Sequence, residues 1–271
     1  MNISTLWKHR LLFAALYFSE GAPIGFLWWA LPAQLRLEGV PIEQITLLTS
    51  VLVLPWTLKF LWAPLIDVLT DARWTLKHWI LSAQGLMAAC LAPLLFVDIS
   101  TAFAIVVAFL LLHAVAAATQ DVAIDALAIR TVPSGERGRI NGWMQAGMLL
   151  GRSLFGGVSL IILTRLDHKV VILCLMLAIL SSAILLLQMR LAPQGTSRTE
   201  DRKERFTEFF SQLRSVATAR STRLGFVVAL MAGAAFEGTG AVAGPFLVDR
   251  GFAAKSVGTF FGIHVIVAMM S

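Results

Sequence analysis

The stretch "TAFAIVVAFLLLHAVAAATQDVAIDALAIR", residues 101–130, decides the class of fold, because most of it is an uninterrupted apolar run. A helix of about 20 apolar residues is long enough to cross the hydrocarbon core of a bilayer. Similar runs recur along the chain, which is 58% hydrophobic, 14% charged and has a mean hydropathy of +0.79. Soluble domains carry about a quarter charged residues. The sequence therefore predicts an all-α, multi-spanning membrane protein. The presence of Asp121 and Asp125 inside one of its spans then requires an explanation.

The hydropathy pattern predicts up to eight membrane spans, of which the eighth is short for a full crossing. We place them at about 11–35, 43–66, 78–97, 101–129, 140–163, 170–189, 224–248 and 256–271. The connections contain helix-breaking residues such as Pro41, Pro133 and Gly135. The first run is too long for a cleavable signal peptide and is followed by no small-residue cleavage site.

The distribution of Lys and Arg predicts the orientation of the spans, because cytoplasmic loops carry an excess of both. One side holds Lys8, Arg10, Arg73, Lys77, Arg130, Arg137, Arg139 and the basic residues of 190–223, while the other holds Arg36, Arg165, Lys169, Arg250 and Lys255. The N-terminus and the segment 190–222 are thus expected in the cytoplasm. The net charge of +6 follows from this topology, so nucleic acid is not an expected partner.

The segment 190–222 differs in composition from the rest and divides the chain into three parts. Thr199 is a plausible helix N-cap, and apolar residues follow at helical spacing: Phe206, Phe209, Phe210, Leu213 and Val216. We expect an amphipathic helix on the cytoplasmic membrane face, with a solvated connector as the alternative. The expected domains are a six-helix half at 1–189, this linker at 190–222, and the start of a second half at 223–271.

A weak internal repeat supports this division. "LPAQLRLEGVPIEQI" (31–45) resembles "GPFLVDRGFAAKSV" (244–257), and "FSEG" (18–21) resembles "AFEG" (235–238). The seventh span then repeats the first in the same orientation, and parallel six-helix repeats are a known plan of transporters. On this plan the second half is incomplete at Ser271, so the sequence is expected to be a fragment.

Ionisable side chains inside the spans are the candidate functional residues, since each is unfavourable at the bilayer centre by about 2.5–3.5 kcal/mol. We assign the transport path and proton coupling to Glu20, Asp121, Arg152 and Glu237, with Gln120 on the face of Asp121. The alternative is a purely structural buried ion pair. Lys59 is expected to extend toward the membrane surface, and His113 to be a packing residue.

Several other function classes find no support in the sequence. Two acids four residues apart on one helix point the same way and cannot clasp a peptide bond as an aspartyl protease does. No metal-binding, Gly-Ser-Gly or nucleotide-binding motif is present. Cys90 and Cys174 both lie in apolar runs and are expected to be packing residues. We therefore expect no enzyme activity, no cofactor and no metal.

Three stretches resemble one family of membrane proteins. "LPWTLKFLWAPLID" (54–67), "ATQDVAIDALAI" (118–129) and "ERGRINGWMQAGMLLGRSLFGG" (136–157) resemble the AmpG-type muropeptide permeases and the related acetyl-CoA transporters of the major facilitator superfamily. The resemblance implies a major facilitator fold and places Gln145 and Arg152 in the transport path. The first span, "YFSEGAPIGFLWWALPAQLR", is closer to relatives that resemble siderophore importers.

The resemblance also implies a cytoplasmic gate at the loop between the second and third spans. Asp67 of the family's loop motif is kept, whereas Ala63 replaces a glycine and only Arg73 and Lys77 remain of the basic cluster. Asp125 is expected to pair with Arg73 or Lys77, which leaves the deeper Asp121 within reach of Arg152.

The sequence thus predicts a proton-coupled importer in the bacterial inner membrane for a bulky polar solute such as an anhydromuropeptide. Its expected partners are the lipid bilayer, the solute and protons, with no obligate protein partner. The alternatives are a siderophore importer and a non-transporting membrane receptor or scaffold with the same fold.

Overall fold

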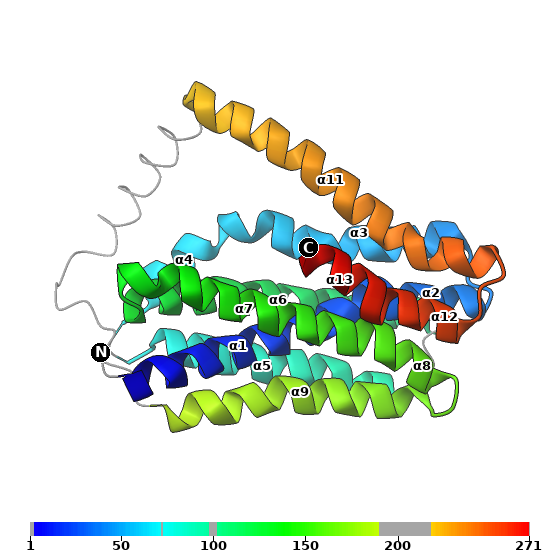
Figure 1. Ribbon diagram of the computed structural model, residues 1–271, viewed down its shortest axis with the longest axis horizontal. Coiled ribbons are helices and arrows are strands. Elements are labelled where there is room, and N and C mark those ends of the chain that lie inside the picture. The colour runs from blue at the N-terminus through cyan, green and yellow to red at the C-terminus, as the bar shows by residue number, and fades with distance from the viewer. Residues whose placement is uncertain (1–2, 72, 98–101, 190–217, 271) are drawn as a thin grey trace.

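The computed structural model describes residues 3–71, 73–97, 102–189 and 218–270, and its regular structure in these ranges is entirely helical. Six of the described helices are long and apolar enough to cross a membrane: Leu6–Leu37, Ile42–Leu61, Leu76–Leu95, Phe103–Thr131, Ser134–Leu163 and His168–Gln188. They confirm the first six predicted spans to within a few residues. Figure 1 shows these helices running alongside one another as one bundle.

Most spans consist of more than one helical segment. The first span contains α1 (Ile3–Gly25), η1 (Phe26–Ala30) and α2 (Leu31–Leu37). The second contains α3 (Ile42–Leu58) and η2 (Lys59–Leu61), with α4 (Ala63–Leu69) after it, and the third contains α5 (Leu76–Leu91) and η3 (Ala92–Leu95). The fourth is a single helix, α6 (Phe103–Thr131). The fifth contains η4 (Ser134–Glu136), α7 (Arg137–Ser153), η5 (Leu154–Val158) and α8 (Ser159–Leu163), and the sixth is α9 (His168–Gln188).

The seventh and eighth predicted spans also correspond to helices. They are α11 (Arg220–Asp249), followed by α12 (Ala254–Thr259), η6 (Phe260–His264) and α13 (Val265–Met270). That these two cross the membrane stays a prediction. The predicted amphipathic helix falls mostly on 190–217, which lie outside the described residues.

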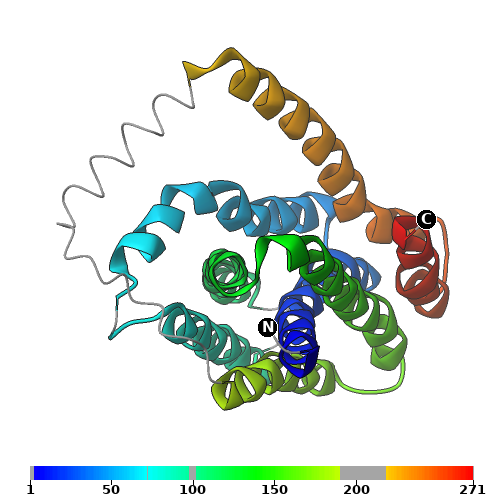
Figure 2. The ribbon, with the colours of Figure 1, turned by 60° about the vertical axis from the view of Figure 1, so that its left-hand side comes forward.

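The fourth span, α6, packs mainly against the third and second spans. Figure 2 looks nearly along this helix, with α1, α3, α5 and α7 around it. Its alanine-rich stretch is buried, including Ala114, Ala116, Ala117, Ala118 and Ala123. Side chains of this size let neighbouring helices approach closely in a membrane protein.

Glycines bring the first and fifth spans into backbone contact. A β-carbon at Gly147 would lie 2.0 Å from the carbonyl oxygen of Ala14, and one at Gly21 would lie 2.2 Å from that of Met148. Gly25 and Gly151 are equally enclosed, by the backbones of Arg152 and Phe18. The position of Arg152 is therefore fixed by the close packing of α7 against α1.

Three π-helical turns occur in the described residues, two in the first and fifth spans and one in the helix of residues 254–270, and they lie next to one another. η1 contacts η5, and η5 contacts η6. Gly156 and Gly157 in η5 make room for this, because a β-carbon at Gly157 would lie 2.3 Å from Gly262. A π-turn offsets the side chains that follow it and is often found at functional sites. Here η1 carries Trp28 and Trp29, and η6 carries Phe260 and Phe261.

The predicted internal repeat corresponds to two loops with the same backbone structure. Gly39 has a φ of 85° and Gly251 a φ of 82°, a left-handed conformation that favours glycine. In both loops the glycine N–H donates to the carbonyl three residues earlier, and the next N–H donates to the carbonyl five residues earlier. This pattern closes the C-terminus of a helix. The sequence similarity therefore reflects one helix–turn–helix corner that occurs twice.

Candidate functional site

Charged side chains from three spans meet inside the bundle. Tyr17 and Glu20 come from α1, Lys59 from the end of the second span, and Asp121 and Asp125 from α6. The Nζ of Lys59 donates a hydrogen bond to Oδ2 of Asp121, and the two form an ion pair. The Oη of Tyr17 donates to Oδ1 of Asp125 over 2.5 Å. We call these five residues the buried charge cluster.

Glu20 is the most enclosed member of the buried charge cluster. It is 2% exposed, and among the described residues its Oε2 has no hydrogen-bond partner. Its carboxyl group interacts electrostatically with Asp121, Lys59 and Asp125. Three carboxyl groups thus share one lysine, and if all were ionised the cluster would carry excess negative charge where charge is poorly solvated.

These contacts correct three expectations from the sequence. Lys59 does not extend toward the membrane surface, because its ammonium group pairs with Asp121. Asp121 therefore pairs with Lys59 and not with Arg152. Asp125 accepts its hydrogen bond from Tyr17 and not from Arg73 or Lys77. The physical reason is the rotation of each span about its axis, which points Lys59 and Tyr17 at α6.

Tyr17 is the member of the cluster that sequence reasoning missed. It is the only tyrosine of the chain, and it lies three residues before Glu20, so both stand on one face of α1. A hydroxyl group in an apolar span needs an acceptor. That requirement, together with its spacing from Glu20, was the available signal.

The other polar residues of the spans have different surroundings. Gln120 is buried and its Nε2 donates to Oγ of Ser19 over 3.3 Å, next to the cluster. His113 is fully buried, and its Nδ1 lies 3.0 Å from the carbonyl of Met87, as suits a packing residue. Gln145 lies on α7 and is exposed, so the structure does not bring it to the cluster.

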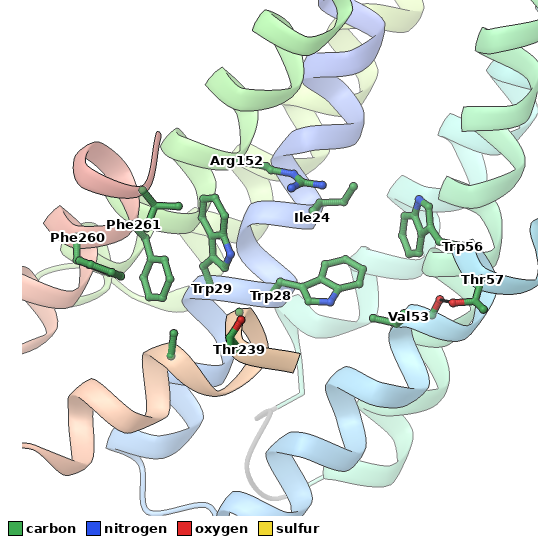
Figure 3. A pocket seen from close by; sticks show the side chains of 13 residues that line it. Ile24, Trp28, Trp29, Val53, Trp56, Thr57, Arg152, Thr239, Phe260 and Phe261 are labelled. Carbon is green, nitrogen blue, oxygen red and sulfur yellow. Dashed lines mark hydrogen bonds between the residues drawn. The ribbon is translucent and has the colours of Figure 1, made fainter. Parts of the chain in front are cut away.

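A cavity of about 470 Å³ lies beside η1, between the first, second and fifth spans and the helices of residues 220–270. Its lining is mainly aromatic, and Arg152 is its one charged residue among the described residues that form it. Figure 3 shows the side chain of Arg152 extending between Trp29 and Trp56, close to Trp28. The hydroxyl groups of Thr57 and Thr239 also line the cavity.

The two remaining predicted residues of the transport path belong to this region. Arg152 lies at the cavity and not in the buried charge cluster. Glu237 lies on α11, two residues before Thr239, and its side chain is outside the described part of the chain. Among the described residues, the predicted path is therefore divided between the buried charge cluster and the cavity that Arg152 lines.

The predicted cytoplasmic gate is also rearranged. Asp67 pairs with Arg130 at the end of α6, with 2.8 Å between Oδ1 and Nη2. Lys77 instead donates to the backbone carbonyls of Leu187 and Met189. Arg73 is exposed, and its backbone N–H donates to Asp71. Asp67, Arg73 and Asp125 therefore do not form one contact.

The opposite end of the bundle is closed by contacts between the two parts of the chain. Nε of Arg36 lies 2.6 Å from Oδ1 of Asp249, which joins the loops that repeat one another. Deeper in, Oγ of Ser153 donates to the carbonyl of Gly262 over 2.5 Å. These contacts join the first half to the helices of residues 220–270.

Comparison with known proteins relates the chain to membrane transport proteins. A segment of 146 residues is 28% identical to the anhydromuropeptide permease of Escherichia coli (strain K12), and it covers 54% of this chain and 30% of that protein. A segment of 155 residues is 32% identical to an uncharacterized protein of Haemophilus influenzae, covering 55% of this chain and 36% of that protein. The chain thus matches about a third of the length of these curated relatives.

A broader match covers nearly the whole chain. Residues 12–271 match the Major Facilitator Superfamily. Members of this family are transporters and not enzymes, and the six apolar helices agree with a multi-pass membrane protein. The chain belongs to the Major Facilitator Superfamily.

Proposed function

We propose that this chain is part of a proton-coupled importer of the bacterial inner membrane, with its N-terminus in the cytoplasm. The buried charge cluster is the observation that carries this proposal. Its three carboxyl groups and one lysine lie between the first, second and fourth spans, in surroundings where a change in protonation has a large electrostatic effect.

The proton-coupling step centres on the ion pair of Lys59 and Asp121. When Asp121 binds a proton, the attraction to Lys59 is lost, and the second span is released from α6. When the proton leaves, the pair re-forms and draws the spans together. Glu20 contributes a further carboxyl group to the same electrostatic field, so proton binding and span movement are linked.

The imported solute is bulky, polar and anionic. Arg152 supports this, since it places a permanent positive charge at the cavity. The relatives named as anhydromuropeptide permease make an anhydromuropeptide the first solute to test. A siderophore is the second, because the first span resembles that branch.

The decisive experiment compares accumulation with exchange in liposomes that contain the full-length protein to which this chain belongs. Asp121→Asn is expected to abolish accumulation driven by a pH gradient while solute exchange remains. Asp125→Asn, which leaves the ion pair with Lys59 in place, is expected to slow transport without uncoupling it. Normal accumulation by Asp121→Asn would show that coupling lies elsewhere, and absence of both accumulation and exchange in the unmodified protein would favour a receptor.

The orientation has its own test. In a protein without Cys90 and Cys174, Lys203→Cys is expected to resist an impermeant thiol reagent added to intact cells, and His168→Cys to react. The reverse pattern would invert the topology.

A further inference from the structure

The buried charge cluster and the cavity are neighbours along two of the spans. On α1, Glu20 of the cluster lies four residues before Ile24, which lines the cavity. On the second span, Trp56 of the cavity lining lies three residues before Lys59 of the cluster. Residues at these spacings stand on one face of a helix. The cluster and the cavity therefore follow one another along the same faces of both spans.

Trp56 is the side chain that reaches both places. Its ring lines the cavity and packs edge to face against Trp28, with ring centroids 5.2 Å apart and planes at 78°. Figure 3 shows this ring across from Ile24 and Trp28. The indole N–H of Trp56 interacts with the carboxyl group of Glu20 as a hydrogen-bond donor. A movement of the ring in the cavity therefore changes the hydrogen bonding of a carboxyl group in the buried charge cluster.

The indole N–H of Trp56 favours one protonation state of Glu20. A donor stabilises an ionised carboxyl group more than a protonated one, because it brings a partial positive charge to the carboxylate. Glu20 is 2% exposed, so little water is available to replace a donor that moves away. Departure of the indole N–H thus favours binding of a proton by Glu20, and its return favours release.

The charges that act on Glu20 come from the buried charge cluster, whose other members are Tyr17, Lys59, Asp121 and Asp125. The helices α7 and α9 also pack against α1. The first of these brings Arg152 next to Gly25, at the cavity, and its other charged residues lie in its first turn. The second carries its charged residues in its first turn and the exposed Cys174 further along. Within the described part of the chain, Trp56 is thus the contact that joins Glu20 to the cavity.

We propose that Trp56 is the positioning residue that couples occupancy of the cavity to protonation of Glu20. A solute in the cavity takes the space in front of the Trp56 ring and turns the indole N–H away from Glu20. Glu20 then takes up a proton from solution, so that solute and proton are bound together. When the solute leaves, the ring returns and the proton is released. This proposal rests on the proposed import function and names the contact that links its two sites.

Filling the cavity with a covalent label tests this link without a chosen solute. In the full-length protein, freed of all other cysteines, Thr239→Cys places a thiol in the cavity lining for reaction with N-phenylmaleimide. Infrared difference spectra in lipid membranes follow the carboxyl band that Glu20→Gln removes. We expect the label to move the midpoint of this titration to higher pH by about 1–2 units, a gain in proton affinity of about 10- to 100-fold.

Matched variants assign the shift to the indole N–H of Trp56. Trp56→Phe keeps an aromatic ring but cannot donate, so Glu20 is expected to titrate at the higher pH before labelling, and the label should add no further shift. Trp28→Phe makes the same chemical change on the neighbouring ring and is expected to keep the shift. Thr164→Cys, at an exposed position outside the cavity, is the control for the label itself. Circular dichroism checks that each variant is folded.

Three results would overturn the proposal. The first is a Glu20 titration that does not change when Thr239→Cys is labelled, and this test needs no substitution of Trp56. The second is an equal shift in Trp56→Phe, and the third is loss of the shift in Trp28→Phe. Because the spectra need no proton gradient, these outcomes differ from a failure of coupled transport. Uncoupling by Asp121→Asn without a shift of Glu20 on labelling would leave the proposed function intact and overturn only this inference.

Discussion

The two side chains of the Lys59–Asp121 ion pair differ in how far they are buried. The side chain of Lys59 is 36% exposed, while that of its partner Asp121 is 8% exposed. Removal of the lysine therefore leaves an almost buried carboxylate, whereas removal of the acid leaves an ammonium group that can still reach water. The two single substitutions should not be equivalent.

A double-mutant cycle tests this asymmetry. Lys59→Met is expected to lower the free energy of unfolding by about 2–4 kcal/mol, because the buried charge of Asp121 loses its partner. Asp121→Leu is expected to cost about 1–2 kcal/mol, and the double variant should recover most of the loss. Unfolding in detergent, followed by circular dichroism, measures all three. Additive losses would mean that the two side chains do not interact in solution.

The contribution of Asp167 to stability is expected to depend on pH. The side chain of Asp167 accepts a hydrogen bond from the backbone N–H of Lys169 and caps α9. That bond, with smaller contributions from the charges of His168 and Lys169, lowers the pKa of Asp167. A carboxyl group whose pKa is lower in the folded than in the unfolded protein stabilises the folded state. This contribution is complete when the pH is above the unfolded-state pKa, and it is lost as the pH falls through the folded-state pKa.

Asp167→Asn should therefore remove a pH dependence without removing the cap, since asparagine also caps helices. The difference in thermal unfolding temperature between the original protein and this variant is expected to shrink as pH falls below the ordinary range of Asp. Asp167→Ala should be less stable than both at neutral pH. The range from about pH 3 to about pH 7 includes the ordinary titration of an Asp carboxyl group. If the difference in unfolding temperature between the original protein and Asp167→Asn stayed the same over this range, the ionised cap would be ruled out.

At the scale of residues, the sequence singled out the ionisable side chains inside the spans but did not predict their partners. Glu20, Asp121 and Asp125 were conspicuous because each is ionisable in an apolar run. Their partners depend on how far each span is rotated about its own axis. That rotation is set by contacts such as Gly147 against Ala14, which are not readable from one span alone.

Among the helices, the close approach of α1 and α7 depends on single glycines. Gly147→Ala is expected to cost about 1–3 kcal/mol or more, because its methyl group would meet a backbone carbonyl that cannot move alone. Gly142, on the same helix, has nothing within 4 Å of a β-carbon. Gly142→Ala should therefore stabilise α7 by up to about 1 kcal/mol.

Thermal unfolding of the two alanine variants provides the measurement. Equal effects at both positions would mean that α7 does not contact α1 as described. This comparison isolates packing, since both substitutions make the same chemical change in the same helix.

The predicted helices were close to those observed because a run of apolar residues and its breakers are local features. The corner at Gly39 and its copy at Gly251 could likewise be found from local patterns. The π-turns could not, because η1, η5 and η6 contain no residue pattern that distinguishes them from ordinary helix. They depend on contacts between spans, such as that of Gly156 with Trp29.

For the whole molecule, the ion pair of Arg36 and Asp249 joins the first half to the helices that follow the linker. Their side chains are 28% and 45% exposed, and such pairs contribute about 0.2–1 kcal/mol. Breaking the pair should thus shift a balance between closed and open forms by about 1.5- to 5-fold, without abolishing either form.

Cysteine accessibility can detect this shift. Arg36→Asp is expected to raise the rate at which a thiol reagent reaches a cysteine placed at Thr239 in a protein without Cys90 and Cys174. Combining it with Asp249→Arg should return the rate toward the original. No change with Arg36→Asp would mean that Ser153, Gly157 and Gly262 hold this end closed without the ion pair.

The adjacent π-turns have a mechanical consequence. Each π-turn replaces the i→i+4 hydrogen bonds of an α-helix by i→i+5 hydrogen bonds. The regular α-helical pattern is therefore interrupted at neighbouring positions in three helices. A bending axis therefore runs from η1 through η5 to η6, past the tryptophans of the cavity wall. We expect flexure about this axis to change the width of the cavity while α6 and the buried charge cluster keep their shape.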